Sequence, residues 1–259
     1  GIPAETAIKE CAPGQFEINL FHHDDALLMA DQTFLLKRLI KNCARQFNMN
    51  ATFMAKPFSD EAGNGMHVHL SVVDKDGNNV FTMDKNKQPQ GLFSHAIAGL
   101  LKTTPDFLSF YAPHSNSYRR LVHNADHAPT TLSWGNENRT ALIRLPEASA
   151  EATRLEFRVA SADSNPYLVF ASVLASVYAG IQGNFPLDKE TIGNAHAQHP
   201  PLLGVTWTDA VVKTGVSSLV KDFFGEQFQQ CYKCVKESEI KRFESTITDF
   251  EYHSYLRCL

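Results

Sequence analysis

The hexapeptide Arg154-Leu155-Glu156-Phe157-Arg158-Val159 alternates charged and apolar side chains. In a β-strand successive side chains point to opposite faces, so Arg154, Glu156 and Arg158 share one face and the apolar residues share the other. Charged side chains within such an apolar strand must be paired or must face a polar cavity. We therefore expect this strand to line a polar site on one face and to pack into a core on the other.

Two further stretches gather polar side chains in the same way. In Met66–Ser71 the imidazoles of His67 and His69 share one face of a strand. In Gly14–Leu20 the polar face consists of Gln15, Glu17 and Asn19, and the apolar face of Phe16, Ile18 and Leu20. Because carboxylates and imidazoles bind divalent metals and guanidiniums bind phosphate, the three stretches predict a site for a metal and a phosphorylated ligand.

The composition is that of an ordinary globular enzyme. The chain has 259 residues, of which 43% are hydrophobic and 20% charged, and its net charge is −4. The length allows one large domain or two. The small net charge and the lack of a basic run give no reason to expect nucleic acid or a membrane surface as a partner. The longest apolar stretch, Leu168–Ile181, is too short to span a bilayer and is interpreted as a core helix.

The cysteines favour a reducing compartment. Their number is odd and they are scattered, and the first residues carry no secretory signal, so we expect a cytoplasmic protein. Cys231 and Cys234 have the spacing of a metal or redox pair, but no second pair completes a site, and we expect two reduced thiols on a helix. The chain opens at Gly1 without a methionine, as expected of a segment of a longer polypeptide.

The apolar periodicity predicts long helices and short strands. Helices are expected from the cap Asp24-Asp25 to about Phe47, from Leu92 to about Lys102 with an end before Pro105, from the cap Ser164-Asn165-Pro166 to Gly180 or Gly183, and through the C-terminal third. Strands are expected at Ala51–Met54, Thr131–Trp134, Arg139–Leu145 and Arg154–Val159, with a loop over 111–130. This mixture predicts an α+β fold.

Two pairs of residues are candidate metal ligands. Glu10 and Glu17 flank a Pro-Gly turn, which would fold both carboxylates toward one cation. The alternative is two exposed surface glutamates, which is the usual state of this residue. His67 and His69 follow the flexible loop Gly63-Asn-Gly65, and the alternative for them is a pair of hydrogen-bonded histidines without a ligand.

Arginines are concentrated in and before the two strands expected at Arg139–Leu145 and Arg154–Val159. They are Arg119, Arg120, Arg139, Arg144, Arg154 and Arg158. Arginines are usually exposed, but arginines inside apolar strands with a glutamate between them fit a site that neutralises phosphate and carboxylate.

The order of these motifs resembles the glutamine synthetase family. The likeness runs from about Glu10 to Ile181 and weakens toward the C-terminus. The segments that carry it are Glu10-Cys-Ala-Pro-Gly-Gln-Phe-Glu17, Thr52-Phe-Met-Ala-Lys-Pro57, Gly63-Asn-Gly-Met-His-Val-His-Leu-Ser71, Asn116-Ser-Tyr-Arg-Arg-Leu121, Asn138-Arg-Thr-Ala-Leu-Ile-Arg-Leu-Pro146, Arg154-Leu-Glu-Phe-Arg158 and Asn165-Pro-Tyr-Leu168.

The resemblance implies a catalytic domain spanning residues 1–259, with a curved antiparallel sheet that lines the active site and helices packed outside it. It implies an ATP-dependent ligase with Mg²⁺ or Mn²⁺, in which the γ-carboxylate of glutamate attacks the terminal phosphate of ATP. An amine then displaces phosphate from the γ-glutamyl phosphate. Members of the family form homo-oligomeric rings with active sites between subunits, and their N-terminal domain lies outside this chain.

The resemblance also assigns roles to single residues. Glu10 and Glu17 would hold one metal, and His67 and Glu156 the other. The nucleotide and its phosphates would contact His69, Ser71, Arg139, Arg144 and Arg154. The glutamate substrate would contact Gly63, Arg120 and Arg158. Arg139 and Arg158 would act on the transferring phosphoryl and on the glutamate carboxylate, and Asp126 or His127 would take the proton of the amine.

This chain departs from the ammonia-using members where the amine is bound. Ala62 stands in place of an asparagine, and His123–Pro129 replaces a glutamate-bearing flap with a longer segment that contains Asp126 and His127. The segment Ile247–Tyr255 is more similar to the γ-glutamylpolyamine synthetase branch. We therefore expect a polyamine or alkylamine such as putrescine as acceptor. The alternatives are ammonia, as in glutamine synthetase proper, and a non-catalytic relative that keeps the fold.

Overall fold

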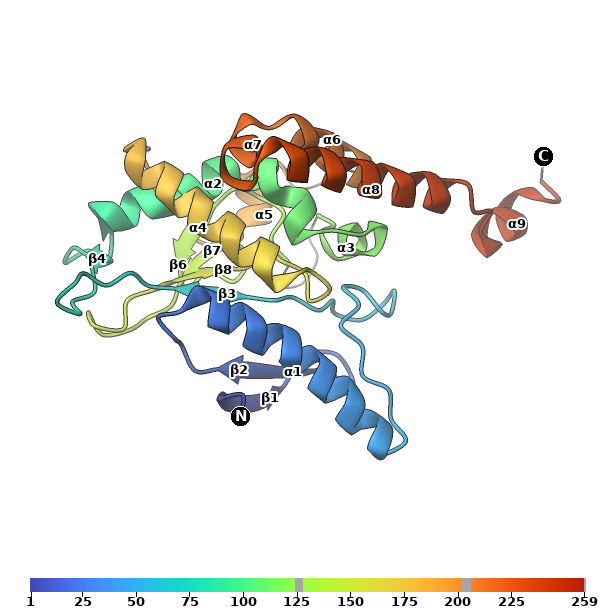
Figure 1. Ribbon diagram of the computed structural model, residues 1–259, viewed down its shortest axis with the longest axis horizontal. Helices are drawn as coiled ribbons and strands as arrows, with labels where there is room; N and C mark the ends of the chain where they lie inside the picture. The colour runs from blue at the N-terminus through green and yellow to red at the C-terminus, as the bar shows by residue number, and fades with distance from the viewer. Residues whose placement is uncertain (124–127, 202–205, 259) are drawn as a thin grey trace.

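The computed structural model describes residues 1–123, 128–201 and 206–258. A four-stranded sheet lies in the middle of the molecule, with most of the helices on one side of it (Figure 1). Helix α1 (Ala26–Gln46) and a two-stranded hairpin lie on the other side. This arrangement of segregated helices and strands confirms the predicted α+β class.

The central sheet has the strand order β3-β8-β7-β6. Its strands are β3 (Val68–Leu70), β8 (Leu155–Phe157), β7 (Ile143–Leu145) and β6 (Trp134–Asn136). Strand β8 pairs antiparallel with both of its neighbours, whereas β6 pairs parallel with β7, so the expectation of an all-antiparallel sheet was wrong at this edge. The physical reason is the loop after β6, which turns the chain back so that β7 begins beside the start of β6.

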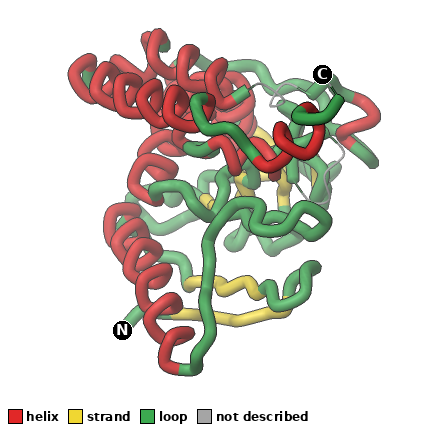
Figure 2. Tube along the Cα trace, turned by 90° about the vertical axis from the view of Figure 1, so that its right-hand side faces the viewer, coloured by secondary structure: helices red, strands yellow, loops and turns green. Residues whose placement is uncertain are grey.

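The hairpin on the other side consists of β1 (Ala4–Lys9) and β2 (Phe16–Leu20), which pair antiparallel. Gly14 has a φ of +70° in the connecting turn, a conformation that glycine adopts at little cost. Within the described residues this hairpin forms a sheet of its own, so a single curved sheet was not found. Figure 2 shows its two strands set apart from the central sheet. A third small sheet pairs β4 (Thr82–Met83) with β5 (Pro89–Gln90).

The apolar face of β8 lies in the main core, as its alternation predicted. Leu155, Phe157 and Val159 are fully buried there together with residues from α2 (Leu92–Tyr111) and α4 (Pro166–Gln182). The charged face of the same strand is therefore directed away from the core and toward α1 and the hairpin.

The caps predicted for two helices are present. The Asp25 side chain accepts hydrogen bonds from the backbone of Leu27 and Leu28 at the start of α1. Asn165 caps α4 in the same way, with Pro166 in its first turn. Side-chain oxygens at these positions satisfy backbone N–H groups that have no partner within the helix.

Four local predictions were wrong. The strand expected at Thr131–Trp134 is instead β6, which begins at Trp134. Helix α2 does not end before Pro105 but continues to Tyr111, because both of its sides are buried and tertiary packing outweighs the one lost hydrogen bond. The stretch predicted as loop contains α3 (Ser115–Arg120). Ala51–Met54 is not a strand: the Met54 amide donates to the Thr52 hydroxyl, and the Met54 carbonyl accepts from the Asn64 side chain.

The C-terminal third is helical, as predicted. Its helices are α6 (Trp207–Val216), α7 (Ser218–Phe224), α8 (Glu226–Glu244) and α9 (Asp249–Tyr255), and the short α5 (Ala195–Gln198) precedes them. Cys231 and Cys234 are exposed free thiols on α8. Across the described ranges, no helix is both long enough and apolar enough to cross a membrane.

Helices α2 and α4 approach each other at two glycines. A Cβ atom at Gly180 would lie 2.2 Å from the His95 carbonyl oxygen and 2.6 Å from the Cα of Gly99. Replacement of Gly180 by alanine is therefore expected to destabilise the protein by about 1–3 kcal/mol through overpacking, despite the better helix propensity of alanine. The free energy of unfolding in urea measures this change.

Gly215 in α6 is the matched control. A Cβ there would meet the flexible Lys233 side chain, 2.7 Å from its Cδ, so this side chain moves aside and the Gly215→Ala substitution is expected to be neutral or stabilising. Equal losses of stability in the two variants would contradict the close backbone contact as the cause.

Candidate active site

The charged face of the central sheet is organised around the carboxylate of Glu156 on β8. This residue is 3% exposed. Its Oε2 accepts a hydrogen bond of 2.7 Å from Arg144 Nη1, and its Oε1 contacts the guanidinium of Arg158. His67 Nδ1 lies 3.1 Å from the same Oε1. Three residues that the sequence placed on separate strands or segments thus meet at one carboxylate.

This arrangement fixes the protonation state of the cluster. Burial alone would raise the pKa of Glu156, but the hydrogen bond from His67 and the charge of Arg158 outweigh it and hold this pKa below its usual range. Burial lowers the pKa of His67 to about 4. At neutral pH Glu156 is therefore ionised and His67 is neutral. The neutral ring donates from Nδ1 to the carboxylate and keeps a lone pair on Nε2.

Arg120 lies beneath the loop that contains Gly63 and Gly65. Its Nη1 donates to the Val159 carbonyl at 2.9 Å and its Nη2 to the Arg158 carbonyl at 3.1 Å. Burial is the main reason that its pKa falls to about 10, so the guanidinium remains charged at neutral pH. A Cβ at Gly63 would lie 2.9 Å from Arg120 Cγ, and a Cβ at Gly65 would lie 2.7 Å from its Nη2. These glycines let the loop backbone lie directly against the arginine.

Glu10 and Glu17 lie on the same face of the β1–β2 hairpin. Ile8 pairs with Glu17, and the Glu10 amide donates to the Gln15 carbonyl at 2.9 Å, so the two glutamates are diagonal neighbours across the strands. The pKa of Glu17 is raised, first by burial and then by the negative charge of Glu10. The turn therefore brings together two carboxylates that repel each other, as its sequence predicted.

Another group of predicted residues lies toward one end of the sheet. Arg154 Nε donates to His69 Nδ1 at 3.2 Å, and burial lowers the pKa of His69, so this imidazole is neutral at neutral pH. Ser71 follows β3 and is exposed, and Arg139 is exposed in the loop between β6 and β7. These side chains are accessible to a ligand, in contrast to the buried Arg120 and Arg158.

Two contacts of the cluster were not predicted from the sequence. Glu137 Oε2 lies 2.6 Å from Arg144 Nη2, on the side of the guanidinium away from Glu156. Gln15 Nε2 donates to the Gly63 carbonyl at 3.0 Å and to Asn64 Oδ1 at 2.8 Å, which ties the hairpin to the glycine loop. Glu137 directly precedes the arginine motif but carries no periodic signal. Gln15 was noted on the polar face of its strand, although its partner was not predictable from spacing.

The catalytic-domain model of glutamine synthetase matches residues 1–255. The chain belongs to the glutamine synthetase family. It is 38% identical over 250 residues to the gamma-glutamylputrescine synthetase of Escherichia coli (strain K12), an alignment that covers 96% of this chain and 52% of that protein. It is 35% identical to the gamma-glutamylethanolamide synthetase of Streptomyces coelicolor, with 97% and 53% covered. The chain spans about half the length of these curated relatives.

A solved structure has a very similar fold. The chain superposes on the structure titled GmaS/ADP complex with a TM-score of 0.87 and 29% sequence identity, covering 100% of this chain and 61% of that one. A GmaS structure without ligand gives a TM-score of 0.86. The central sheet, the hairpin and the helical layer are thus the glutamine synthetase catalytic-domain fold.

The residues at the site are compatible with the divalent cations that the family implies. The Glu10–Glu17 pair offers hard oxygen ligands whose mutual repulsion a cation would relieve. His67 is neutral and oriented by its hydrogen bond to Glu156, an arrangement typical of histidines that bind metals through the other nitrogen. Within the described residues, three or more such ligands do not already converge on one point. The Glu10–Glu17 pair would therefore hold one cation and Nε2 of His67 the other, each together with water or substrate oxygens, while Glu156 would orient the His67 ring.

Two of the predicted catalytic residues, Asp126 and His127, lie outside the described residues. Their role in accepting the amine proton stays a prediction.

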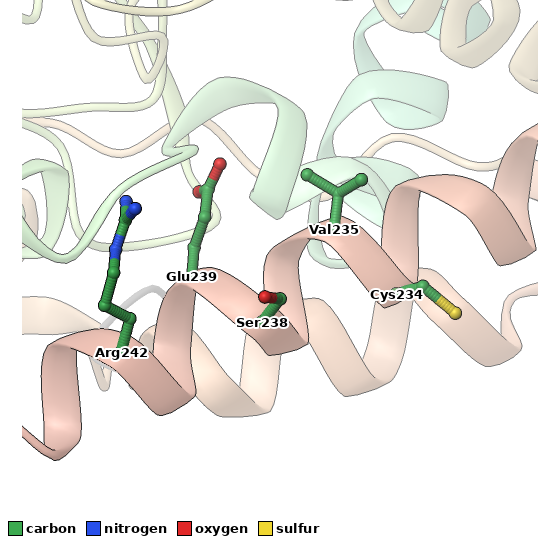
Figure 3. A pocket seen from close by; sticks show the side chains of 5 residues that line it. All are labelled: Cys234, Val235, Ser238, Glu239 and Arg242. Carbon is green, nitrogen blue, oxygen red and sulfur yellow. The ribbon is translucent and has the colours of Figure 1, made fainter.

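A separate depression lies on the surface of α8, far along the chain from the site motifs. It is lined by Cys234, Val235, Ser238, Glu239 and Arg242 (Figure 3). These five residues include none of the predicted site residues, and their side chains project from one helix without converging on a common point.

The carboxylate pair gives a prediction that does not depend on turnover. Because the pKa of Glu17 is raised, folding favours its protonated form, and ionisation lowers the stability of the fold as the pH rises above about 4.5. The Glu17→Gln substitution is expected to raise the thermal midpoint at pH 7 in EDTA. It is also expected to weaken Mn²⁺ binding, measured by electron paramagnetic resonance, at least tenfold, by analogy with the roughly 10–100-fold losses at metal sites.

Glu5, exposed on β1 of the same hairpin, is the control. Glu5→Gln should leave both the thermal midpoint and Mn²⁺ binding unchanged. Wild-type Mn²⁺ affinity in Glu17→Gln would rule out the hairpin as a cation site.

Proposed function

We propose that this chain is the catalytic part of an ATP-dependent ligase that joins the γ-carboxylate of glutamate to an amine. The observation that carries the proposal is the set of positive and negative groups around Glu156, where Arg144, Arg158 and His67 meet. Phosphoryl transfer requires cationic groups fixed around the transferring phosphoryl and anionic ligands for a divalent cation, and little covalent chemistry from the protein.

In the proposed reaction a γ-carboxylate oxygen of glutamate attacks the terminal phosphorus of ATP, and the bond from that phosphorus to the bridging oxygen breaks to release ADP. The amine nitrogen then attacks the acyl carbon of the γ-glutamyl phosphate. The bond between this carbon and the phosphate oxygen breaks, and the nitrogen loses a proton to Asp126 or His127.

The resemblance to the family divides these tasks among the arginines. Arg139 and Arg154 are accessible and would bind the polyphosphate, with Arg144 beside them, and His69 and Ser71 would line the nucleotide. Arg158 and Arg120, together with the backbone of Gly63, would hold the glutamate carboxylates. Mg²⁺ or Mn²⁺ held by Glu10, Glu17 and His67, with the charge of Glu156 behind the His67 ring, would neutralise charge on the phosphates.

The names of the relatives support an alkylamine or polyamine as acceptor. The relatives include proteins named for putrescine and ethanolamide products, as well as the glutamate–isopropylamine ligase of a Pseudomonas species, at 35% identity. Glutamine synthetases are also among them, such as that of Methanocaldococcus jannaschii at 34% identity. We propose an organic amine in preference to ammonia because of Ala62 and the changed segment His123–Pro129.

A hollow beside the hairpin supports an acceptor with a second positive charge. It has a volume of about 620 Å³ and is lined by Pro13, Pro57, Phe58, Ser59, Asp60 and Glu61. Phe58 is 64% exposed, and among the described residues Asp60 and Glu61 take part in no ion pair. An aromatic ring with two carboxylates is a chemical match for an alkylammonium group. Lys56 donates to the Glu61 carbonyl and leaves the carboxylate available.

We also propose assembly into a homo-oligomeric ring with active sites between subunits, in the cytoplasm where ATP is available. The exposed apolar side chains of α9 support contacts between chains. This helix projects from the body (Figure 1), and Phe250, Tyr252 and Tyr255 on it are at least half exposed.

An amine panel tests the reaction. This chain, and the longest natural polypeptide that contains it, would be incubated with ATP, Mg²⁺, glutamate and ammonia, ethanolamine, butylamine or putrescine, and the products weighed by mass spectrometry. A γ-glutamyl alkylamine formed together with ADP is the expected result. Glutamine as the sole product would instead indicate glutamine synthetase proper. No product and no nucleotide binding by the longer polypeptide would indicate a non-catalytic relative.

The acidic hollow gives a sharper prediction about specificity. The double substitution Asp60→Asn/Glu61→Gln is expected to raise the KM for putrescine roughly tenfold, the size of one lost hydrogen bond to a charged group. The KM for butylamine, which has the same chain length and one ammonium group, should not change. The control Asp222→Asn/Glu237→Gln removes two negative charges on α7 and α8 and should leave both values as in the wild type. Equal effects on the two amines would contradict a diamine site in the hollow.

A further inference from the structure

Glu137 has an unusual position in the loop that follows β6. Its φ is +50°, in the left-handed region that side chains with a Cβ rarely adopt. Its amide donates to the Leu145 carbonyl at 3.0 Å, and its Oε1 accepts a hydrogen bond from the Glu147 amide. The backbone and one carboxylate oxygen of Glu137 are therefore both held by β7 and the residues after it. The other oxygen, Oε2, is directed to Arg144 Nη2 at 2.6 Å.

The residues on both sides of Glu137 are fastened to a distant part of the chain. Asn136 Nδ2 donates to Glu190 Oε1 at 2.8 Å. Asn138 Nδ2 donates to the carbonyls of Thr191 and Gly193, each at 2.8 Å. These contacts hold the loop in the conformation that turns the Glu137 side chain back toward β7 and explain how the strained backbone persists.

Arg144 is consequently held at both ends of its guanidinium. Nη1 donates to the buried Glu156 and Nη2 to the half-exposed Glu137, while the arginine itself is 14% exposed. An ordinary ion pair between two exposed side chains contributes little to the stability of the fold, because both side chains are free to move and their charges are screened by water. Here the Glu137 carboxylate is locked by a backbone amide, and it meets a guanidinium whose other end donates to the buried Glu156.

We propose that Glu137 is a positioning residue that fixes the guanidinium of Arg144 beside Glu156, in the orientation that the ATP phosphates require. The proposal rests on the proposed function for its effect on ATP, but the placement of Arg144 is a property of the fold alone. Without Glu137, Arg144 loses one of its two carboxylate partners, and the remaining contact with Glu156 alone does not hold the guanidinium in place.

The geometry separates this role from a competing one. A carboxylate next to Arg144, with Arg139 nearby in the loop, resembles a stand-in for a phosphate that ATP would have to displace. Such a stand-in would be free to leave, whereas Glu137 is held by the Glu147 amide and by its own backbone hydrogen bond. The two roles predict opposite signs, because removal of a competitor tightens nucleotide binding and removal of a support weakens it.

The test compares Glu137→Ala with Glu137→Gln and with a neighbouring control. Glu137→Ala is expected to weaken binding of Mg²⁺ and a non-hydrolysable ATP analogue, measured by calorimetry, and to lower kcat/KM for ATP by roughly 10–100-fold, as is typical of residues that orient a ligand-binding group. KM for glutamate should change little. Glu137→Gln keeps a carbonyl oxygen for Arg144 and should recover part of the loss.

Glu147→Gln is the matched control. Its carboxylate pairs with Lys87 at 2.8 Å on the surface, and the substitution keeps the backbone amide that Glu137 uses. This variant should bind the nucleotide as the wild type does. Wild-type binding by Glu137→Ala, or tighter binding, would overturn the proposal.

A crystal structure of Glu137→Ala provides a readout that needs no turnover. The proposal expects the 2.7 Å contact between Arg144 Nη1 and Glu156 to be lost or lengthened, with the rest of the sheet unchanged. An Arg144 that keeps this contact would refute the positioning role. If the wild type forms no γ-glutamyl product while Arg144 still moves in the variant, the proposed function fails and the positioning role stands.

Discussion

The structure of the site depends on one buried carboxylate. Glu156 is 3% exposed and ionised, and it is stable there because two guanidiniums and an imidazole surround it. A buried charge with good partners gains little net stability, but removal of one partner costs about 3–5 kcal/mol because the remaining charge is left unpaired. Arg144, Arg158 and His67 are therefore constrained together, and the strands that carry them must keep their register.

Neighbouring parts of the fold hold these charged side chains in place. Leu155 and Phe157 anchor the apolar face of β8 in the core, and this fixes the position of Glu156 on the opposite face. Arg120 holds the end of the same strand through the carbonyls of Arg158 and Val159. Its guanidinium is covered by a loop in which side chains larger than hydrogen do not fit at Gly63 and Gly65. A charged layer built in this way is rigid before any ligand arrives, which is what electrostatic catalysis requires.

The hairpin is joined to this layer by few but specific contacts. Gln15 reaches the glycine loop with two hydrogen bonds, and the charge of Glu156 contributes to the raised pKa of Glu17. The Glu10–Glu17 pair thus faces the Glu156 cluster from a separate sheet. Two groups of anionic ligands, one on each sheet, with arginines beside one of them, supply the charges that a metal-bound polyphosphate requires.

The sequence by itself determined the local features whose physical cause lies within a few residues. These are the alternation of β8, the caps at Asp25 and Asn165, and the meeting of Glu10 and Glu17 across a Pro-Gly turn. Tertiary structure decided what depends on distant partners. Helix α2 passes through Pro105 because most of its residues are buried, and β6 runs parallel to β7 because the loop between them turns the chain back. Glu137 acquired its partner in the same way, since a carboxylate in a loop has no periodicity to reveal which arginine it will meet. Short-range patterns indicate which secondary structure a segment prefers and which side chains share a face. The pairing of charges across strands is fixed only when the chain has folded.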